Sequence, residues 1–136
     1  ASQDAQARPF IEKMEEKYDT VIGEKGVGLS GGQKQRISIA RSLAKHTPIL
    51  VMDDSTSALD METEHMIQET LEKLTDTTKL IIAHRISAVK NADEIIVLED
   101  GMIKERGTHE SLIELKGLYY ETYMAQYGII LDRKEA

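Results

Sequence analysis

The sequence has no cysteine, no tryptophan and only two prolines among its 136 residues. Without cysteine, disulfides and thiolate metal sites are excluded. The four histidines share no metal-ligand spacing, which argues against a zinc site. The longest apolar runs are about four residues, as at 80–83 and 95–98, far shorter than the roughly 20 residues that a membrane helix needs. These absences leave a globular chain that depends on ordinary apolar packing.

Clustered positive charge is also lacking. The formal net charge is −7, and lysine and arginine are dispersed along the chain. Because binding to a phosphate backbone depends on clustered positive charge, we expect no direct nucleic-acid partner. A composition of 40% hydrophobic and 30% charged residues is typical of one soluble domain. Residues 1–6 are typical of the middle of a helix, which predicts that the chain begins inside a larger domain.

The sequence lacks a Gly-x-x-x-x-Gly-Lys-Ser/Thr loop, the usual phosphate-binding loop of nucleotide-binding proteins. Two other segments nevertheless indicate a nucleotide site. Residues 29–33 (Leu-Ser-Gly-Gly-Gln) place a hydroxyl and two glycines at the start of a helix, where backbone N–H groups favour an anion. Residues 49–54 (Ile-Leu-Val-Met-Asp-Asp) predict a strand that ends in two carboxylates, which suit a metal ion beside a phosphate. We therefore expect two edges of a nucleoside triphosphate site, with the phosphate loop elsewhere.

Hydrophobic spacing predicts alternating helices and strands in the first two thirds of the chain. The first expected elements are a short helix after Pro9, with Ile11, Met14 and Tyr18 on one face, and a loop with Gly23, Gly26 and Gly28. A helix is then expected from Ser30 to about Lys45, with Ile37, Ala40, Leu43 and Ala44 as its apolar stripe. It is followed by a strand at 49–52, a helix capped by Asp60, and a strand at 80–83 that ends at His84. Ser30 and Gln33 form a capping-box pattern. Both strands are continuous apolar runs, which are typical of strands buried on both faces of a parallel sheet.

The last third of the chain predicts a hairpin and two longer helices. A short helix is expected at 88–92 and a third strand at 95–98. Asp100-Gly101 is a strong signal for a two-residue hairpin turn, with the returning strand at 102–105. Thr108 is expected to cap a helix that ends at Gly117, and a final helix covers 118–127, before a frayed end at 132–136. The alternation of helices and buried strands gives an α/β fold class.

Each candidate segment also has a purely structural interpretation. A Ser-x-x-Gln box is common as a helix cap, adjacent carboxylates form polar turns, and a lone histidine at a strand end is more often structural. Two glycines in a first helical turn, however, each cost roughly 1 kcal/mol of helix propensity relative to alanine, which favours close approach of a phosphate. In the functional interpretation Asp53 holds Mg²⁺ through its water shell and Asp54 faces the nucleophilic water. His84 is then expected at the same carboxyl edge of the sheet.

Four segments, taken in order, resemble the motifs of ATP-binding-cassette (ABC) ATPases. Residues 29–33, continued by Lys-Gln-Arg-Ile-Ser-Ile-Ala-Arg at 34–41, resemble the signature motif and its helix. Residues 49–53 resemble the Walker B strand, Ser-Ala-Leu-Asp at 57–60 the D-loop, and His84 the switch histidine. Three further segments resemble the exporter branch of the family, namely 18–20, 83–87 and 107–110. The resemblance identifies the chain as the carboxyl-terminal half of the nucleotide-binding domain of a multidrug- or lipid-type exporter.

The resemblance implies a partial P-loop NTPase-like parallel sheet with flanking helices. Residues 1–46 correspond to the end of a helical subdomain that carries the signature, 47–128 to the carboxyl-terminal half of the ATPase core with its terminal hairpin and helices, and 129–136 to a tail. It implies ATP and Mg²⁺ as ligands. It also implies three partners: the amino-terminal half with the Walker A loop, a second nucleotide-binding domain, and a transmembrane domain that places the chain at the cytoplasmic face of a membrane.

In the family, two nucleotide-binding domains close head to tail around two ATP molecules. The resemblance therefore implies that the signature completes the site of the opposite subunit. The residues assigned to nucleotide binding are Leu29, Ser30, Gly31, Gly32, Gln33 and Asp60. Asp60 is expected to communicate across the dimer, Asp53 to hold the metal, and Asp54 and His84 to act in catalysis.

One position departs from the family pattern. The usual general base after Walker B is glutamate, and this chain has Asp54. Aspartate is one methylene shorter, which withdraws the carboxylate by about 1.5 Å, the length of one carbon–carbon bond. A misplacement of about 1 Å can cost roughly a hundredfold in rate. We therefore interpret the chain as one subunit of a heterodimeric exporter whose Asp54 site hydrolyses ATP poorly, with a fully active Asp54 as the alternative.

Two other functions remain open from the residues. The first is the carboxyl-terminal half of a chromosome-maintenance or DNA-repair ATPase head, in which a separate phosphate loop is natural. The acidic charge and the exporter-like segments argue against it. The second is a non-catalytic fragment that binds a partner subunit. Without a phosphate loop, the chain alone is expected not to hydrolyse ATP. The transported substrate is not indicated by any residue in this segment.

Overall fold

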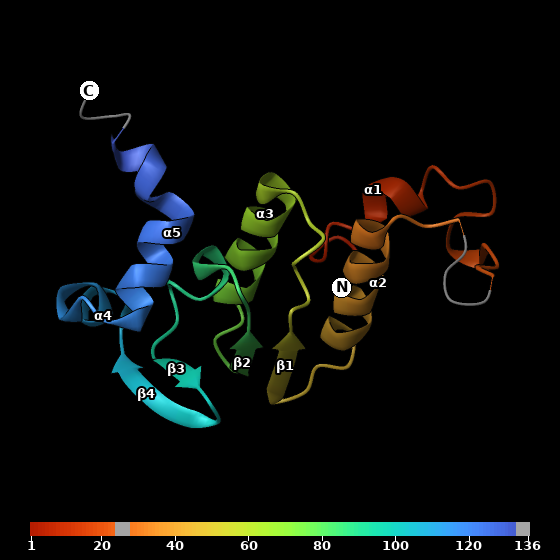
Figure 1. The fold of residues 1–136 in the computed structure, drawn as a ribbon. Helices are drawn as coiled ribbons and strands as arrows, with labels where there is room; N and C mark the ends of the chain where they lie inside the picture. Colours follow the sequence, from red (N-terminus) through yellow and green to blue (C-terminus); the bar gives the residue numbers. More distant parts are fainter. Residues whose placement is uncertain (24–27, 133–136) are drawn as a thin grey trace. The chain divides into compact units, whose positions relative to one another are not determined.

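The computed structural model describes residues 1–23 and 28–132. The chain divides into two compact units, Ala1–Ala83 and His84–Ala136. Each unit combines helices with a two-stranded sheet (Figure 1), which confirms the expected α/β class. Gly26 of the expected loop lies outside the described residues, as does most of the expected frayed end. No helix among the described residues is both long and apolar enough to cross a membrane.

The amino-terminal segment is less helical than its spacing predicts. Helix α1 covers only Arg8–Ile11, and a short 3₁₀ helix, η1, covers Lys17–Asp19. Gln6 and Lys17 adopt φ values of 55° and 50°, in the left-handed region. A left-handed residue interrupts an α-helix. The predictions of helical backbone at 1–6 and of one helix reaching Tyr18 are therefore wrong.

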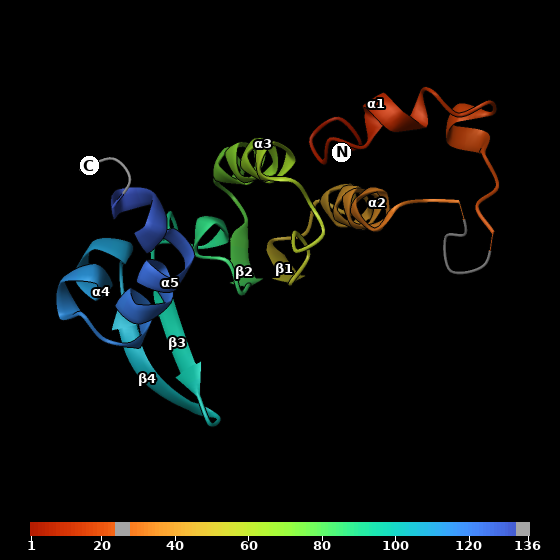
Figure 2. The same ribbon diagram turned by 45° about the horizontal axis from the view of Figure 1, so that its top comes forward.

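The first unit packs two helices on one face of a parallel sheet (Figure 2). Its elements are α2 (Gly31–Leu43), β1 (Ile49–Asp53), α3 (Met61–Glu72) and β2 (Thr78–Ile82). The strands are parallel, with Val51 opposite Leu80 and Asp53 opposite Ile82. The core consists of buried residues from α2, β1, α3 and the connecting segments: Ala5, Ile39, Leu50, Met52, Leu59, Ile67 and Leu71. Ile39, absent from the expected stripe, is the buried residue of α2, whereas Ala44 is its exposed C-cap.

The prediction that both strands are buried on both faces is wrong. Alternate residues of β1 are buried and exposed, and Ile49 and Val51 are 60% and 56% exposed. Leu80 and Ile82 of β2 are likewise about half exposed. Helices α2 and α3 both pack on the face of the sheet that carries Leu50 and Met52. Among the described residues, nothing buries the other face, which carries the half-exposed side chains named above. An aliphatic surface on the sheet is therefore left uncovered.

The second unit is a hairpin packed against helices. It contains η3 (Ile86–Ala88), β3 (Ile95–Glu99), β4 (Met102–Gly107), α4 (His109–Leu115) and α5 (Leu118–Asp132). Asp100 and Gly101 both have positive φ, at 51° and 73°, as a type I′ turn requires, which confirms the hairpin prediction. The expected short helix is a 3₁₀ turn, and α5 continues past the expected end at residue 127. Ile86, Ile95, Leu112 and Tyr119 form the core.

A carboxylate from the β-hairpin caps the start of α5. Glu105 accepts hydrogen bonds from the backbone N–H groups of Leu118 and Tyr119, at 2.5 and 3.0 Å. A Cβ on Gly117 would overlap this carboxylate, so a side chain there would force the Glu105 carboxylate to move. The preceding helix, α4, begins at the predicted cap, Thr108, and ends at Lys116 in the left-handed conformation. Glu105 thus satisfies N–H groups that have no acceptor within the helix.

Candidate functional site

The tip of α2 has the predicted cap. The Ser30 hydroxyl accepts from the backbone N–H of Gln33 at 3.2 Å, and the Gln33 side chain accepts from the Ser30 N–H at 2.9 Å. The capping-box prediction is therefore confirmed. Leu29, half-buried, precedes the cap, and Ser30 is exposed. The Gln33 side chain is thus occupied within its own helix, while the O–H of Ser30 remains able to donate.

The two glycines of the tip lie against the turn that follows β1. A Cβ on Gly32 would stand 3.1 Å from the carbonyl oxygen of Ala58, which is tighter than an ordinary contact. On Gly31 it would meet the Ala58 Cβ at 3.6 Å, an ordinary distance. The close approach that the sequence analysis assigned to a phosphate is therefore made, at Gly32, by the chain's own backbone. A phosphate on the exposed side of the tip remains compatible with this packing.

Gln35 connects α2 to the same turn, and the sequence analysis did not single it out. Its Nε2 donates to the Ser57 hydroxyl at 3.1 Å and to the Asp54 carbonyl at 3.4 Å. Its Oε1 accepts from the Ala58 N–H at 2.9 Å. Nothing in the local sequence marks this contact, because the partners lie 19 to 23 residues away.

The two acids at the end of β1 have different surroundings. Asp53 is exposed, whereas Asp54 is half-buried and has φ 45°, in the left-handed region. The Asp54 N–H donates to the carbonyl of Ile82 at 2.8 Å, which extends the pairing of β1 with β2. The two consecutive acids therefore differ in exposure and in backbone geometry.

Asp60 is a helix cap, as predicted. Its carboxylate accepts from the Thr63 N–H at 2.9 Å and from the Thr63 hydroxyl at 2.8 Å. These hydrogen bonds, the backbone one first, lower the pKa of Asp60 below its ordinary value. The turn from 54 to 60 has a further buried anchor, since the Thr56 hydroxyl donates to Glu64 at 3.1 Å. Both oxygens of Asp60 are thus engaged within α3, and its assigned role across a dimer stays a prediction.

His84 follows β2 and is the first residue of the second unit, whereas both acids belong to the first. The His84 side chain is exposed. Its backbone carbonyl accepts from the Gln126 side chain at 2.7 Å, and the Gln126 oxygen accepts from the Ile86 N–H at 3.0 Å. Gln126 of α5 therefore holds the backbone on both sides of Arg85, a contact over about forty residues that sequence patterns do not reveal.

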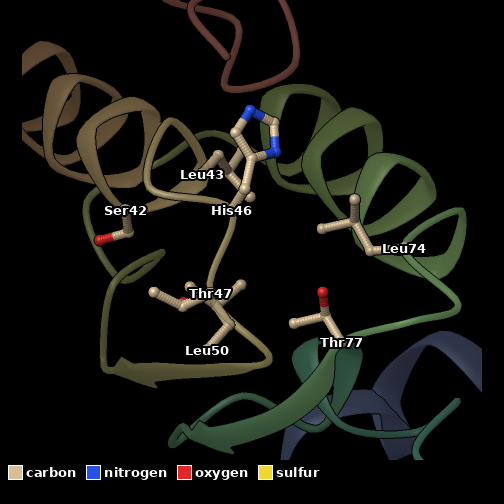
Figure 3. A pocket seen from close by; sticks show the side chains of 7 residues that line it. All are labelled: Ser42, Leu43, His46, Thr47, Leu50, Leu74 and Thr77. Carbon is tan, nitrogen blue, oxygen red and sulfur yellow. The ribbon is translucent and has the colours of Figure 1, made fainter.

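A small cavity lies at the other end of the sheet. It measures about 40 Å³ and is lined by Ser42, Leu43, His46, Thr47, Leu50, Leu74 and Thr77 (Figure 3). These residues come from the end of α2, the connection to β1, the start of β1 and the segment after α3. The volume suits a water molecule or two rather than a nucleotide. The candidate site is therefore the edge formed by the α2 tip and residues 53–60.

The donor set at this edge fits Mg²⁺ bound jointly with a phosphate. No group of three or more acidic, histidine or cysteine residues in the described part of the chain forms a complete metal site. Mg²⁺ is usually bound by one or two carboxylates, with waters and substrate phosphates completing its shell. The exposed carboxylate of Asp53 meets this requirement.

The chain is similar to known proteins in sequence and in fold. A family model described as ABC transporter matches residues 2–57. The ATP-dependent lipid A-core flippase of Pasteurella multocida (strain Pm70) is 54% identical over 127 residues, which cover 93% of this chain and 22% of the flippase. The flippase of the same name from Escherichia coli (strain K12) is 54% identical over 129 residues, covering 94% and 22%. The chain thus spans about a fifth of the length of these relatives.

A solved structure is also similar. The structure of a bacterial Atm1-family ABC exporter with ATP bound matches with a TM-score of 0.88 and 43% identity, over 92% of this chain and 22% of that one. Together with the order of motifs, these matches show that the chain is similar, over more than nine tenths of its length, to one segment of ABC exporters. Asp60 and His84 lie beyond the 2–57 match, and their expected roles stay predictions.

Proposed function

We propose that this chain supplies the signature tip, the Walker B acids, the D-loop and the switch histidine to an ATPase that drives export across a membrane. The observation that carries the proposal is the packing of the α2 tip on the turn that follows Asp53 and Asp54, through Gly32 and Gln35. The exporter relatives support it, and they favour it over a chromosome-maintenance ATPase.

The tip of α2 is the proposed contact for the γ-phosphate of an ATP bound mainly by a second nucleotide-binding domain. The first N–H groups of a helix have no acceptor within it, and the helix dipole favours an anion there. Ser30 supplies a hydroxyl donor, and Gly31 and Gly32 supply the first backbone N–H donors of the helix. Loss of the phosphate removes the target of these donors, so closure of the two domains weakens after hydrolysis.

The acids act on the chain's own ATP site in this proposal. Asp53 would hold Mg²⁺, which when bound neutralises charge on the phosphate oxygens. Asp54 accepts a proton from the attacking water, and His84 orients that water beside the γ-phosphate. Asp54 carries the shorter side chain in place of the family's glutamate, so we propose that this site turns over slowly. The Ser30 tip would then serve a faster site on a different partner subunit.

The remaining parts of the machine are proposed to lie in the rest of the parent protein and its partner. These parts are the Walker A half of the domain, a transmembrane domain and a second nucleotide-binding domain, with the whole ATPase at the cytoplasmic face of the membrane. The curated relatives carry the name lipid A-core flippase, so an amphipathic lipid is the first substrate class to test.

The deciding experiment measures ATP turnover of the complete transporter with Asp54→Glu. A longer carboxylate restores reach toward the water, so we expect turnover at this site to rise about tenfold or more. Asp76→Glu, an exposed acid in the loop after α3, is the matched control and leaves turnover unchanged. An unchanged rate in Asp54→Glu overturns the slow-site proposal. ATP hydrolysis by the isolated 136-residue chain would contradict the need for a separate phosphate loop.

A further inference from the structure

The side-chain amide of Gln35, a residue of α2, makes several hydrogen bonds to the turn after β1. One amide reaches three groups of that turn: the Asp54 carbonyl, the Ser57 hydroxyl and the Ala58 N–H. Two of these partners are backbone groups. The contact therefore constrains the path of the turn itself rather than one side chain on it.

The turn begins in a conformation that needs support. Asp54 has φ 45°, a region that non-glycine residues occupy at a cost of the order of 1 kcal/mol or more and keep when their surroundings enforce it. Within the turn, the Asp54 carbonyl accepts from the Ser57 hydroxyl at 3.1 Å and from the Ser57 N–H at 3.4 Å. Gln35 adds a donor to that carbonyl from a separate element, together with an acceptor for Ala58.

The same helix begins at Ser30, five residues before Gln35. Over that distance an α-helix is a stiff element, so the position of the tip and the position of the turn are linked through one side chain. Gly32 packs on the Ala58 carbonyl, and the lack of a side chain at Gly32 allows this close contact. The position of the α2 tip is thus linked to the position of Asp54.

We propose that Gln35 is a positioning residue for Asp54, which fixes the turn carrying this acid against the tip of α2. The inference rests on the proposed function of Asp54 and deepens it. In the proposed dimer, the tip serves the ATP of the opposite subunit and Asp54 serves its own, so Gln35 also connects the two ATP sites. Because Gln35 hydrogen-bonds the turn and not the helix tip, its loss lowers the rate of hydrolysis and leaves ATP binding unchanged.

The test uses the complete transporter in the Asp54→Glu background, where turnover at this site is measurable. Gln35→Met keeps the length of the side chain and removes its hydrogen bonds. Gln35→Glu keeps an acceptor for the Ala58 N–H and loses the donor to the Asp54 carbonyl. Ser38→Ala, an exposed position on the same helix, is the control. We expect kcat to fall about tenfold in Gln35→Met, with KM for ATP within twofold, and Gln35→Glu to lie between.

A second measurement does not depend on turnover. The Ala58 N–H donates to Gln35, so hydrogen exchange in a peptide spanning 54–60 of the complete transporter becomes faster in Gln35→Met and not in Ser38→Ala. Unchanged exchange, or a kcat within twofold of the background, overturns the inference. A failure of Asp54→Glu to raise turnover overturns only the slow-site proposal, in which case Gln35→Met is compared with the unmodified transporter. A rise in KM without a fall in kcat assigns Gln35 to ATP binding and also overturns the inference.

Discussion

Gly32 faces the carbonyl oxygen of Ala58, which would lie 3.1 Å from a Cβ at that position. The neighbouring Gly31 faces the Ala58 side chain at an ordinary 3.6 Å. The two consecutive glycines of this helical turn therefore face different neighbours, at different distances. At Gly32 a methyl group would press on the chain's own turn, which would have to move by a few tenths of an ångström, whereas Gly31 has room for a methyl group.

The first prediction compares alanine at these two positions. Gly31→Ala gains helix propensity, so we expect equal or greater stability, whereas Gly32→Ala must displace the Ala58 carbonyl, in a turn that Gln35 holds through the Ala58 N–H. We expect Gly32→Ala to be about 1 kcal/mol less stable than Gly31→Ala. Urea unfolding of the two variants gives the difference directly. Equal stabilities would show that the turn yields to the methyl group.

The second prediction concerns the start of α5. Glu105→Ala removes the acceptor for the N–H groups of Leu118 and Tyr119, and we expect a loss of about 1–2 kcal/mol of unfolding free energy. Glu105→Gln keeps one acceptor oxygen and should lose less. Glu114→Ala, an exposed acid of α4, is the control and changes stability by about 0.5 kcal/mol at most. A loss in the control as large as in Glu105→Ala would rule out the capping role.

The third prediction is an alkaline loss of stability. Burial raises the pKa of Tyr119 to about 12 from an ordinary value of 10.0, and neighbouring Tyr127 adds to the shift. The folded state thus keeps a proton that the unfolded state releases, so the contribution is complete below pH 10 and disappears as pH rises toward 12. Two pKa units correspond to about 3 kcal/mol at most, and screening by nearby solvent reduces the expected loss to about 1 kcal/mol.

Tyr119→Phe tests the alkaline effect. This variant lacks the titrating group, so its unfolding free energy should fall less between pH 10 and 12 than that of the unmodified chain. At neutral pH it loses the 2.8 Å hydrogen bond with Nδ1 of His109, worth about 1 kcal/mol. Tyr120→Phe is the control on the same helix. Parallel pH curves for Tyr119→Phe and the unmodified chain would contradict the assignment.

The fourth prediction concerns acid and the start of α3. The pKa of Asp60 is lowered in the folded state, first by the Thr63 N–H. Its contribution to stability is therefore complete above the ordinary value of 3.8 and is lost as pH falls through the lowered folded value. Asp60→Asn keeps a capping oxygen without a titrating group, so its stability should fall less steeply below pH 4. Unfolding curves at several acidic pH values, with Asp76→Asn as control, measure the difference.

Local signals in the sequence were sufficient for much of the fold. The caps at Ser30, Asp60 and Thr108 and the turn at Asp100-Gly101 depend on residues within a few positions of one another, and each is confirmed. Periodicity was less reliable. An apolar run such as 49–52 was interpreted as buried on both faces, but burial depends on which elements cover the sheet, and here α2 and α3 cover the same face.

By itself the sequence determined the order of the motifs, the helix caps, the hairpin and the kinship with ABC exporters, because these depend on residue types at short spacing. The tertiary structure alone decided that Gln35 holds the turn after Asp54, that Glu105 caps α5 and that Gln126 holds the backbone around Arg85. Each of these contacts joins residues 13 to 42 positions apart. A hydrogen bond over such a distance leaves no period or spacing in the chain, since only the folded backbone brings its donor and acceptor together.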